Sequence, residues 1–178
     1  MRRRSSQTRP LTSPALEQLA LRYVERYATT RAKLAAYLER KLYERGWEGA
    51  DEADPRGLAE RMAELGYIDD RGFAEARAAA MGRRGLGARR VAAALRHAGI
   101  ESDDADAIAP AIEANAVESA LAFARRRRIG PYSEEVADRQ LQEKQLAAML
   151  RAGHGFDLAR KIVSMAPGEE TETLLLAH

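Results

Sequence analysis

Apolar residues recur at helical spacing along most of this chain, and three of the resulting stripes end at a glycine. In the clearest stripe, over residues 34–42, a leucine stands at every fourth position. The three stripe ends are Leu42 before Gly46, Leu95 before Gly99 and Met149 before Gly153. These glycines are 53 and 54 residues apart, and a fixed period of this size is typical of stacked helical repeats. The pattern therefore predicts an all-α protein made of tandem helical repeats.

Short polar residues before the stripes predict where the helices begin. Such side chains accept a hydrogen bond from a free N–H of the first helical turn, and a proline that follows them favours that turn further. A longer helix is expected after Pro110, ending at Ile129, and the last helix is expected from Phe156 to Met165. The predicted capping residues are Ser13, Thr29 or Thr30, Asp54, Asp69 or Asp70, Ser102 and Ser133.

These elements divide the chain into five segments. We expect a disordered basic arm over residues 1–12, helical repeats over 13–54, 55–101 and 102–166, and a flexible tail over 167–178. A unit of this length is only marginally stable alone, so each repeat is expected to bury its apolar stripe against the next.

The composition excludes several classes of protein. There is no cysteine, so disulfides and thiolate metal sites are ruled out. No apolar run approaches the roughly 20 residues that span a bilayer. The basic start at Arg2, Arg3 and Arg4 lacks the apolar stretch of a secretory signal. We therefore expect a cytoplasmic protein without a membrane partner.

The net charge is only +2, but the charges form blocks of one sign. From Arg71 to Gly99 seven arginines are opposed by one acid, Glu75, whereas from Glu101 to Ser119 every charged residue is acidic. Arginine grips phosphates with a planar fork and stacks on bases, so its clustering favours a polyanion-binding surface over a merely solvated one. The candidates are Arg77, Arg83, Arg84, Arg89, Arg90, Arg96, Arg125, Arg126 and Arg127.

Helical geometry refines this surface at two places. Arg89 and Arg96 lie within about 20° of each other on a helix, and Arg89 points away from Val91. The four arginines at residues 125–128 sweep about 300°, so they cannot share one face. We expect Arg128 to turn toward the core side, where it must reach past the helix end or pair with an acid.

The sequence contains no recognisable catalytic or cofactor-binding pattern. Gly85-Leu86-Gly87 lacks the preceding strand and the third glycine of a nucleotide loop, so a sharp break between two helices explains it better. The three histidines have no partner at zinc-ligand spacing. Capping accounts for the acid pair Asp69-Asp70 without a metal. We expect a non-enzymatic protein with no metal, no cofactor and no small-molecule substrate.

The middle of the chain resembles the RecX family of RecA recombinase regulators. The matching residues are Gly-Tyr-Ile-Asp-Asp-Arg-Gly-Phe-Ala at 66–74, Gly-Leu-Gly-Ala-Arg-Arg-Val at 85–91 and Leu-Arg-His-Ala-Gly-Ile at 95–100. The likeness extends more weakly over residues 15 to 165. The first repeat departs from the family's pattern: where the family has an Arg-x-x-Ser-x-x-Glu-Leu stretch, this chain has Tyr27, Thr30, Lys33 and Leu34.

The resemblance implies three three-helix repeats in an elongated, curved array. It also implies binding in the groove of the RecA filament on single-stranded DNA, and damping of ATP hydrolysis, strand exchange and co-protease activity. Such a protein would act in homologous recombination, DNA repair and the SOS response. The arginine candidates would then face DNA or filament. The candidates for contact with the recombinase are Glu101, Asp103, Asp104 and Asp106.

Two other functions fit the residues. The segment 86–99 could act as a helix-turn-helix-like reader in a stand-alone nucleic-acid-binding protein, although base-reading Asn and Gln are scarce near Arg89. A structural helical adaptor, whose charges serve only solubility, is the third possibility, and it predicts no salt-dependent affinity for a polyanion.

Overall fold

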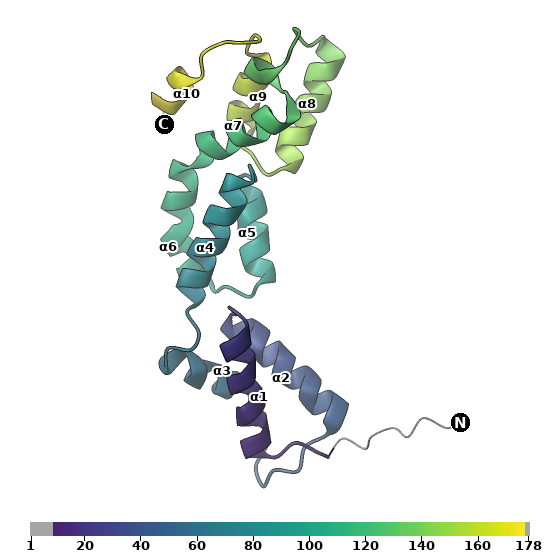
Figure 1. Ribbon diagram of the computed structural model, residues 1–178, viewed down its shortest axis with the longest axis vertical. Helices are drawn as coiled ribbons and strands as arrows, with labels where there is room; N and C mark the ends of the chain where they lie inside the picture. The colour runs from purple at the N-terminus through teal and green to yellow at the C-terminus, as the bar shows by residue number, and fades with distance from the viewer. Residues whose placement is uncertain (1–8, 177–178) are drawn as a thin grey trace, which may run out of the picture. The chain divides into compact units, whose positions relative to one another are not determined.

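In the computed structural model, residues 9–176 are described, and they form helices joined by turns and loops without a strand (Figure 1). The expected all-α class is confirmed for this part of the chain. The elements are α1 (Ser13–Arg26), α2 (Arg31–Arg45), α3 (Pro55–Glu64), α4 (Asp70–Arg83), α5 (Ala88–His97), α6 (Ser102–Ala114), α7 (Ala116–Arg127), the 3-10 turn η1 (Gly130–Tyr132), α8 (Arg139–Arg151), α9 (Phe156–Ser164) and α10 (Glu172–Leu176).

The helices group into two compact units. The first contains the described residues up to Phe73 together with Ala98–Ile100, and the second contains Ala74–His97 and the described residues from Glu101 on. The predicted second repeat, 55–101, is thus divided, because α3 packs on α1 and α2. The three repeats and the curved array they would form stay predictions.

The core of the first unit is built from the predicted leucine stripe. Leu34 and Leu38 on α2 are completely buried, and α1 and α3 cover them with Leu16, Ala20 and Leu58. The caps at both ends of α2 also follow the sequence. The Thr30 hydroxyl accepts from the Lys33 N–H, and Gly46 ends the helix with a φ of +78°, a region that favours glycine.

The predicted arm over residues 1–12 is wrong at its inner end. Leu11 is completely buried, and its backbone forms a short bridge beside Trp47. Its N–H donates to the Gly46 carbonyl and its own carbonyl accepts from the Glu48 N–H, both at 2.9 Å. Burying a leucine stabilises a fold by about 1.5–3 kcal/mol, which together with these two hydrogen bonds helps to offset the entropy lost when this segment is ordered. The arginines at positions 2–4 lie outside the described residues.

The second unit has its core between α7, α8 and α9, where Leu121, Met149 and Ile162 meet. The predicted flexible tail is wrong in part, because Leu174 on α10 packs against this core. The Gly168 N–H also donates to the Pro131 carbonyl at 2.9 Å.

Two predicted helix boundaries in the second unit are also corrected. Helix α6 already begins at Ser102 and passes through Pro110, and a new helix, α7, follows Asn115. Ser133 does not cap a helix, because its hydroxyl donates to the Gly130 carbonyl in η1. Asp138 caps α8 instead.

Candidate nucleic-acid interface

The nine predicted arginines are all exposed on the second unit. They come from α4, from the turn after it, from α5 and from the last turn of α7. None of them forms an ion pair with a carboxylate of residues 9–176. No carboxylate of these residues therefore competes for the guanidinium groups with phosphate, the ligand that suits the planar fork, although Arg125 donates to the Tyr132 hydroxyl at 3.4 Å.

The turn between α4 and α5 is held by the turn between α8 and α9. The Gly87 N–H donates to the Ala152 carbonyl at 2.9 Å, and the Arg89 N–H donates to the Gly153 carbonyl at 3.2 Å. A Cβ on Gly87 would lie 2.4 Å from the Gly153 carbonyl carbon, so only glycine allows this approach. The interpretation of Gly85-Leu86-Gly87 as a helix break is confirmed, and the structure adds that the break is a docking point.

This turn also brings the two arginine blocks of the sequence together. A Cβ on Gly85 would lie 2.6 Å from the Phe123 backbone nitrogen and 2.7 Å from the Arg126 Nη2 atom. Arg84 immediately precedes Gly85, so the end of α4 and the end of α7 meet at this point. Arg77 and Arg96 stand further along their helices, roughly 9–11 Å from Arg83 and Arg89 at 1.5 Å per residue.

Arg128 departs from the prediction. Helix α7 ends at Arg127, and Arg128 adopts a φ of +52°, so its side chain leaves the helix and does not turn toward the core. It is exposed and pairs with Glu134 at 2.6 Å. Of the two arrangements expected for Arg128, pairing with an acid is thus confirmed, whereas the expected direction toward the core is wrong.

The four acidic candidates all lie at the start of α6. Glu101 is the N-cap position, Asp103 and Asp104 belong to the first turn, and Asp106 follows. Carboxylates at this end of a helix interact favourably with its dipole, which gives them a local structural role. Contact with a recombinase stays a prediction.

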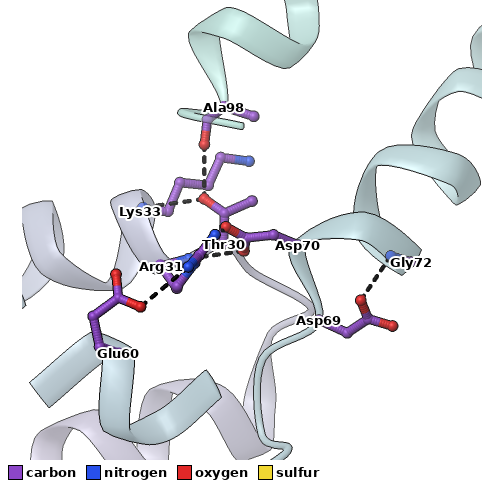
Figure 2. Close-up of polar contacts among 8 residues, drawn as sticks. All are labelled: Thr30, Arg31, Lys33, Glu60, Asp69, Asp70, Gly72 and Ala98. Carbon is purple, nitrogen blue, oxygen red and sulfur yellow. Dashed lines mark hydrogen bonds and ion pairs between the residues drawn. The ribbon is translucent and has the colours of Figure 1, made fainter. Parts of the chain in front are cut away.

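The sequence did not reveal the polar junction at the start of α2 (Figure 2). Asp69 caps its own helix, since its Oδ1 atom accepts from the Gly72 N–H at 2.8 Å. Asp70 is buried and instead accepts from the backbone N–H and the Nε atom of Arg31, each at 3.0 Å. This carboxylate raises the pKa of Arg31 above its ordinary value. Thr30 completes the junction by donating to the Ala98 carbonyl at 2.7 Å.

His154 is a second buried polar residue that the sequence left without a role. Its Nε2 atom lies 3.1 Å from the Gly85 carbonyl, and its ring packs 5.6 Å from that of Phe123. Burial lowers the pKa of His154, more than the Gly85 carbonyl raises it. The ring is therefore neutral at pH 7, and Nε2 carries the proton that the carbonyl accepts.

The described residues contain no group of three His, Cys, Asp or Glu side chains placed to hold a metal ion. Within the same residues, every helix is too short or too polar to cross a membrane.

Fold and surface together define an all-helical protein with an exposed arginine surface on one of its two units. No family model matches the chain. It is 29% identical over 167 residues to "Regulatory protein RecX" of Myxococcus xanthus, covering 89% of each chain. It is also 29% identical over 160 residues to the protein of that name in Agrobacterium fabrum, covering 88% of this chain and 85% of the relative.

A solved structure shares the fold of this chain. The crystal structure of RecX from Lactobacillus salivarius matches with a TM-score of 0.63, covering 84% of this chain and 93% of that chain. At 22% identity this match shows the fold. The resemblance to the RecX family is confirmed by these curated relatives.

Proposed function

We propose that this protein regulates a RecA-type recombinase by binding its filament on single-stranded DNA. The observation that carries the proposal is the set of nine exposed arginines without a carboxylate partner among the described residues, in a chain similar to RecX proteins. A surface of this kind supplies phosphate contacts and electrostatic attraction to the filament's DNA.

Inhibition follows if the protein prefers one state of the filament. Only a difference in affinity between two filament conformations can shift their equilibrium. A protein that binds the ATP-bound form better would stall hydrolysis, and with it strand exchange and co-protease activity. In this mechanism the arginines of α5 and α7 face DNA, while the acids at the start of α6 meet basic recombinase surface.

The test is single-stranded-DNA-dependent ATP hydrolysis by the cognate recombinase while the protein is titrated in. We expect hydrolysis to fall at ratios well below one protein per recombinase subunit. Unchanged hydrolysis at equimolar protein, with both proteins folded, would refute the regulator function.

One observation favours a second candidate, a stand-alone nucleic-acid-binding protein. Helices α4 and α5 are joined by the four residues 84–87, which include two glycines, as in helix-turn-helix units. The exposed Arg89, Arg90 and Arg96 would then read duplex DNA from α5. Sequence-selective binding to a duplex without recombinase would favour this function.

A further inference from the structure

Three tyrosines of the first unit form an aromatic cluster that the arginine surface does not include. Tyr23 on α1 and Tyr37 on α2 stack with ring centroids 4.4 Å apart and an interplanar angle of 25°. Tyr27, one turn after Tyr23, lies 5.2 Å from it in a tilted arrangement. Tyr23 and Tyr37 also pack against the core of the unit, whereas Tyr27 is 49% exposed. The cluster thus runs from the core to the surface.

Arginines surround these rings. The Arg26 guanidinium carbon lies 5.5 Å from the centroid of the Tyr27 ring, and that of Arg40 lies 5.6 Å from the Tyr37 ring. Arg22 is exposed on the same helix. Neither Arg22 nor Arg26 pairs with a carboxylate of the described residues, and Arg40 has only a loose ion pair, 3.8 Å from Glu44.

The rings and guanidinium groups enclose an open hollow of about 400 Å³. Its walls are made by α1, by Tyr27 directly after it and by α2; the other lining residues are Leu19, Arg22, Tyr23, Arg26, Tyr37 and Arg40. No carboxylate contributes to the lining. The hollow therefore offers aromatic faces and positive charge without a group that would repel an anion.

We propose that this tyrosine–arginine hollow is a second binding site for single-stranded DNA, in which a base stacks on Tyr27 and the adjacent phosphates contact Arg22 and Arg26. Aromatic platforms flanked by cations are how proteins hold single strands regardless of sequence, because every base has a flat π-face. In a duplex these faces are covered by neighbouring bases, so the site selects single strands. The site would give the proposed regulator a second contact with the filament's DNA, and its biological role rests on that proposed function.

The stacking residue is tested with a matched set of tyrosine variants. Tyr27→Ala removes the exposed ring, Tyr27→Phe keeps it, and Tyr43→Ala removes a tyrosine that is 94% exposed on α2 and lies outside the hollow. The probe is a fluorescein-labelled oligothymidylate in a polarisation titration without recombinase. We expect Tyr27→Ala to weaken binding about five- to tenfold, since one base–aromatic stack and a tenfold change in affinity are of similar free energy. The other two variants should bind within about twofold of wild type.

Two further experiments test the phosphate contact of Arg26 and the proximity of the bound DNA to Tyr27. Arg26→Ala should reduce the slope of log affinity against log salt by ~0.7, the value for one phosphate of a single strand. In a photocrosslinking experiment, an oligonucleotide that carries 5-bromodeoxyuridine should become attached to the peptide that contains Tyr27. The proposal is overturned if Tyr27→Ala binds the oligonucleotide as tightly as wild type does, or if Tyr43→Ala loses as much affinity as Tyr27→Ala. It is also overturned if Tyr27→Ala binds DNA normally but binds DNA-free recombinase more weakly, because the hollow would then be a protein-binding surface.

Failure of this site and failure of the regulator function give different results. If the site is wrong, DNA affinity does not change in Tyr27→Ala although wild-type protein still suppresses the recombinase ATPase. If the regulator function is wrong, wild-type protein leaves ATP hydrolysis unchanged whatever the variants do to DNA affinity.

Discussion

Asp70, the first residue of α4, fixes the start of α2 through Arg31. One carboxylate oxygen accepts from the Arg31 backbone N–H and the other accepts from its Nε atom, each at 3.0 Å (Figure 2). Arg31 also reaches Glu60 on α3 at 3.1 Å. One buried acid thus joins two helix starts within the first unit, and the arginine extends the connection to a third helix.

Removing this acid should destabilise the protein. We expect Asp70→Ala to lower the free energy of unfolding by about 2–3 kcal/mol, because the α2 start loses a cap and Arg31, which is partly exposed, loses its buried partner. The matched control is Asp69→Ala, which removes an exposed cap of α4 alone and should cost about 1 kcal/mol. Urea unfolding followed by circular dichroism measures both, and equal losses would contradict the assigned role of Asp70.

His154 should make stability depend on pH. Its pKa is lowered in the folded state, so on acidification the unfolded chain takes up the proton first. Stability is therefore complete above the unfolded pKa, about 6.5, and falls as pH decreases toward the folded pKa. The measurement is the difference in unfolding free energy between wild type and His154→Gln at several pH values. Below about pH 6.5 the unfolding free energy of the wild type should fall relative to that of His154→Gln. A difference that stays constant with pH would disprove the linkage.

Gly87 should tolerate no side chain. A Cβ there would meet the Gly153 carbonyl, whose backbone cannot move without breaking the hydrogen bonds between the two turns. We expect Gly87→Ala to cost about 2 kcal/mol or more. Gly82→Ala on α4 is the control, since nothing lies within 4 Å of its Cβ position and helix propensity should add up to ~1 kcal/mol. Thermal unfolding distinguishes the two, and a neutral Gly87→Ala would contradict the close approach.

Charge reversal on α5 tests the arginine surface. Arg89→Glu with Arg90→Glu should weaken binding to the recombinase filament and flatten its salt dependence, with a slope smaller by ~1.4 if each arginine contacts one phosphate of the single strand. Arg139→Glu reverses an arginine of α8 that is also exposed but pairs with Glu143, and should leave the slope unchanged. Filament affinity measured at several salt concentrations decides, and an unaltered slope in the double variant would remove α5 from the DNA-facing surface.

The sequence by itself determined those features that depend on near neighbours in the chain. The leucine stripe of α2, the caps Thr30 and Asp54 and the break at residues 85–87 arise from interactions within three or four positions, so periodicity and residue type suffice to predict them. The exposure of Arg89 and Arg96 followed from the same helical geometry.

Only the tertiary structure decided which distant residues meet. Nothing local distinguishes Asp70, which reaches across 39 positions to Arg31, from Asp69, which caps its own helix. The burial of Leu11 against Trp47 and the three-tyrosine cluster likewise required the packing of separate segments. A contact between distant segments depends on how whole helices pack, and the short-range pattern of a single sequence does not contain that information.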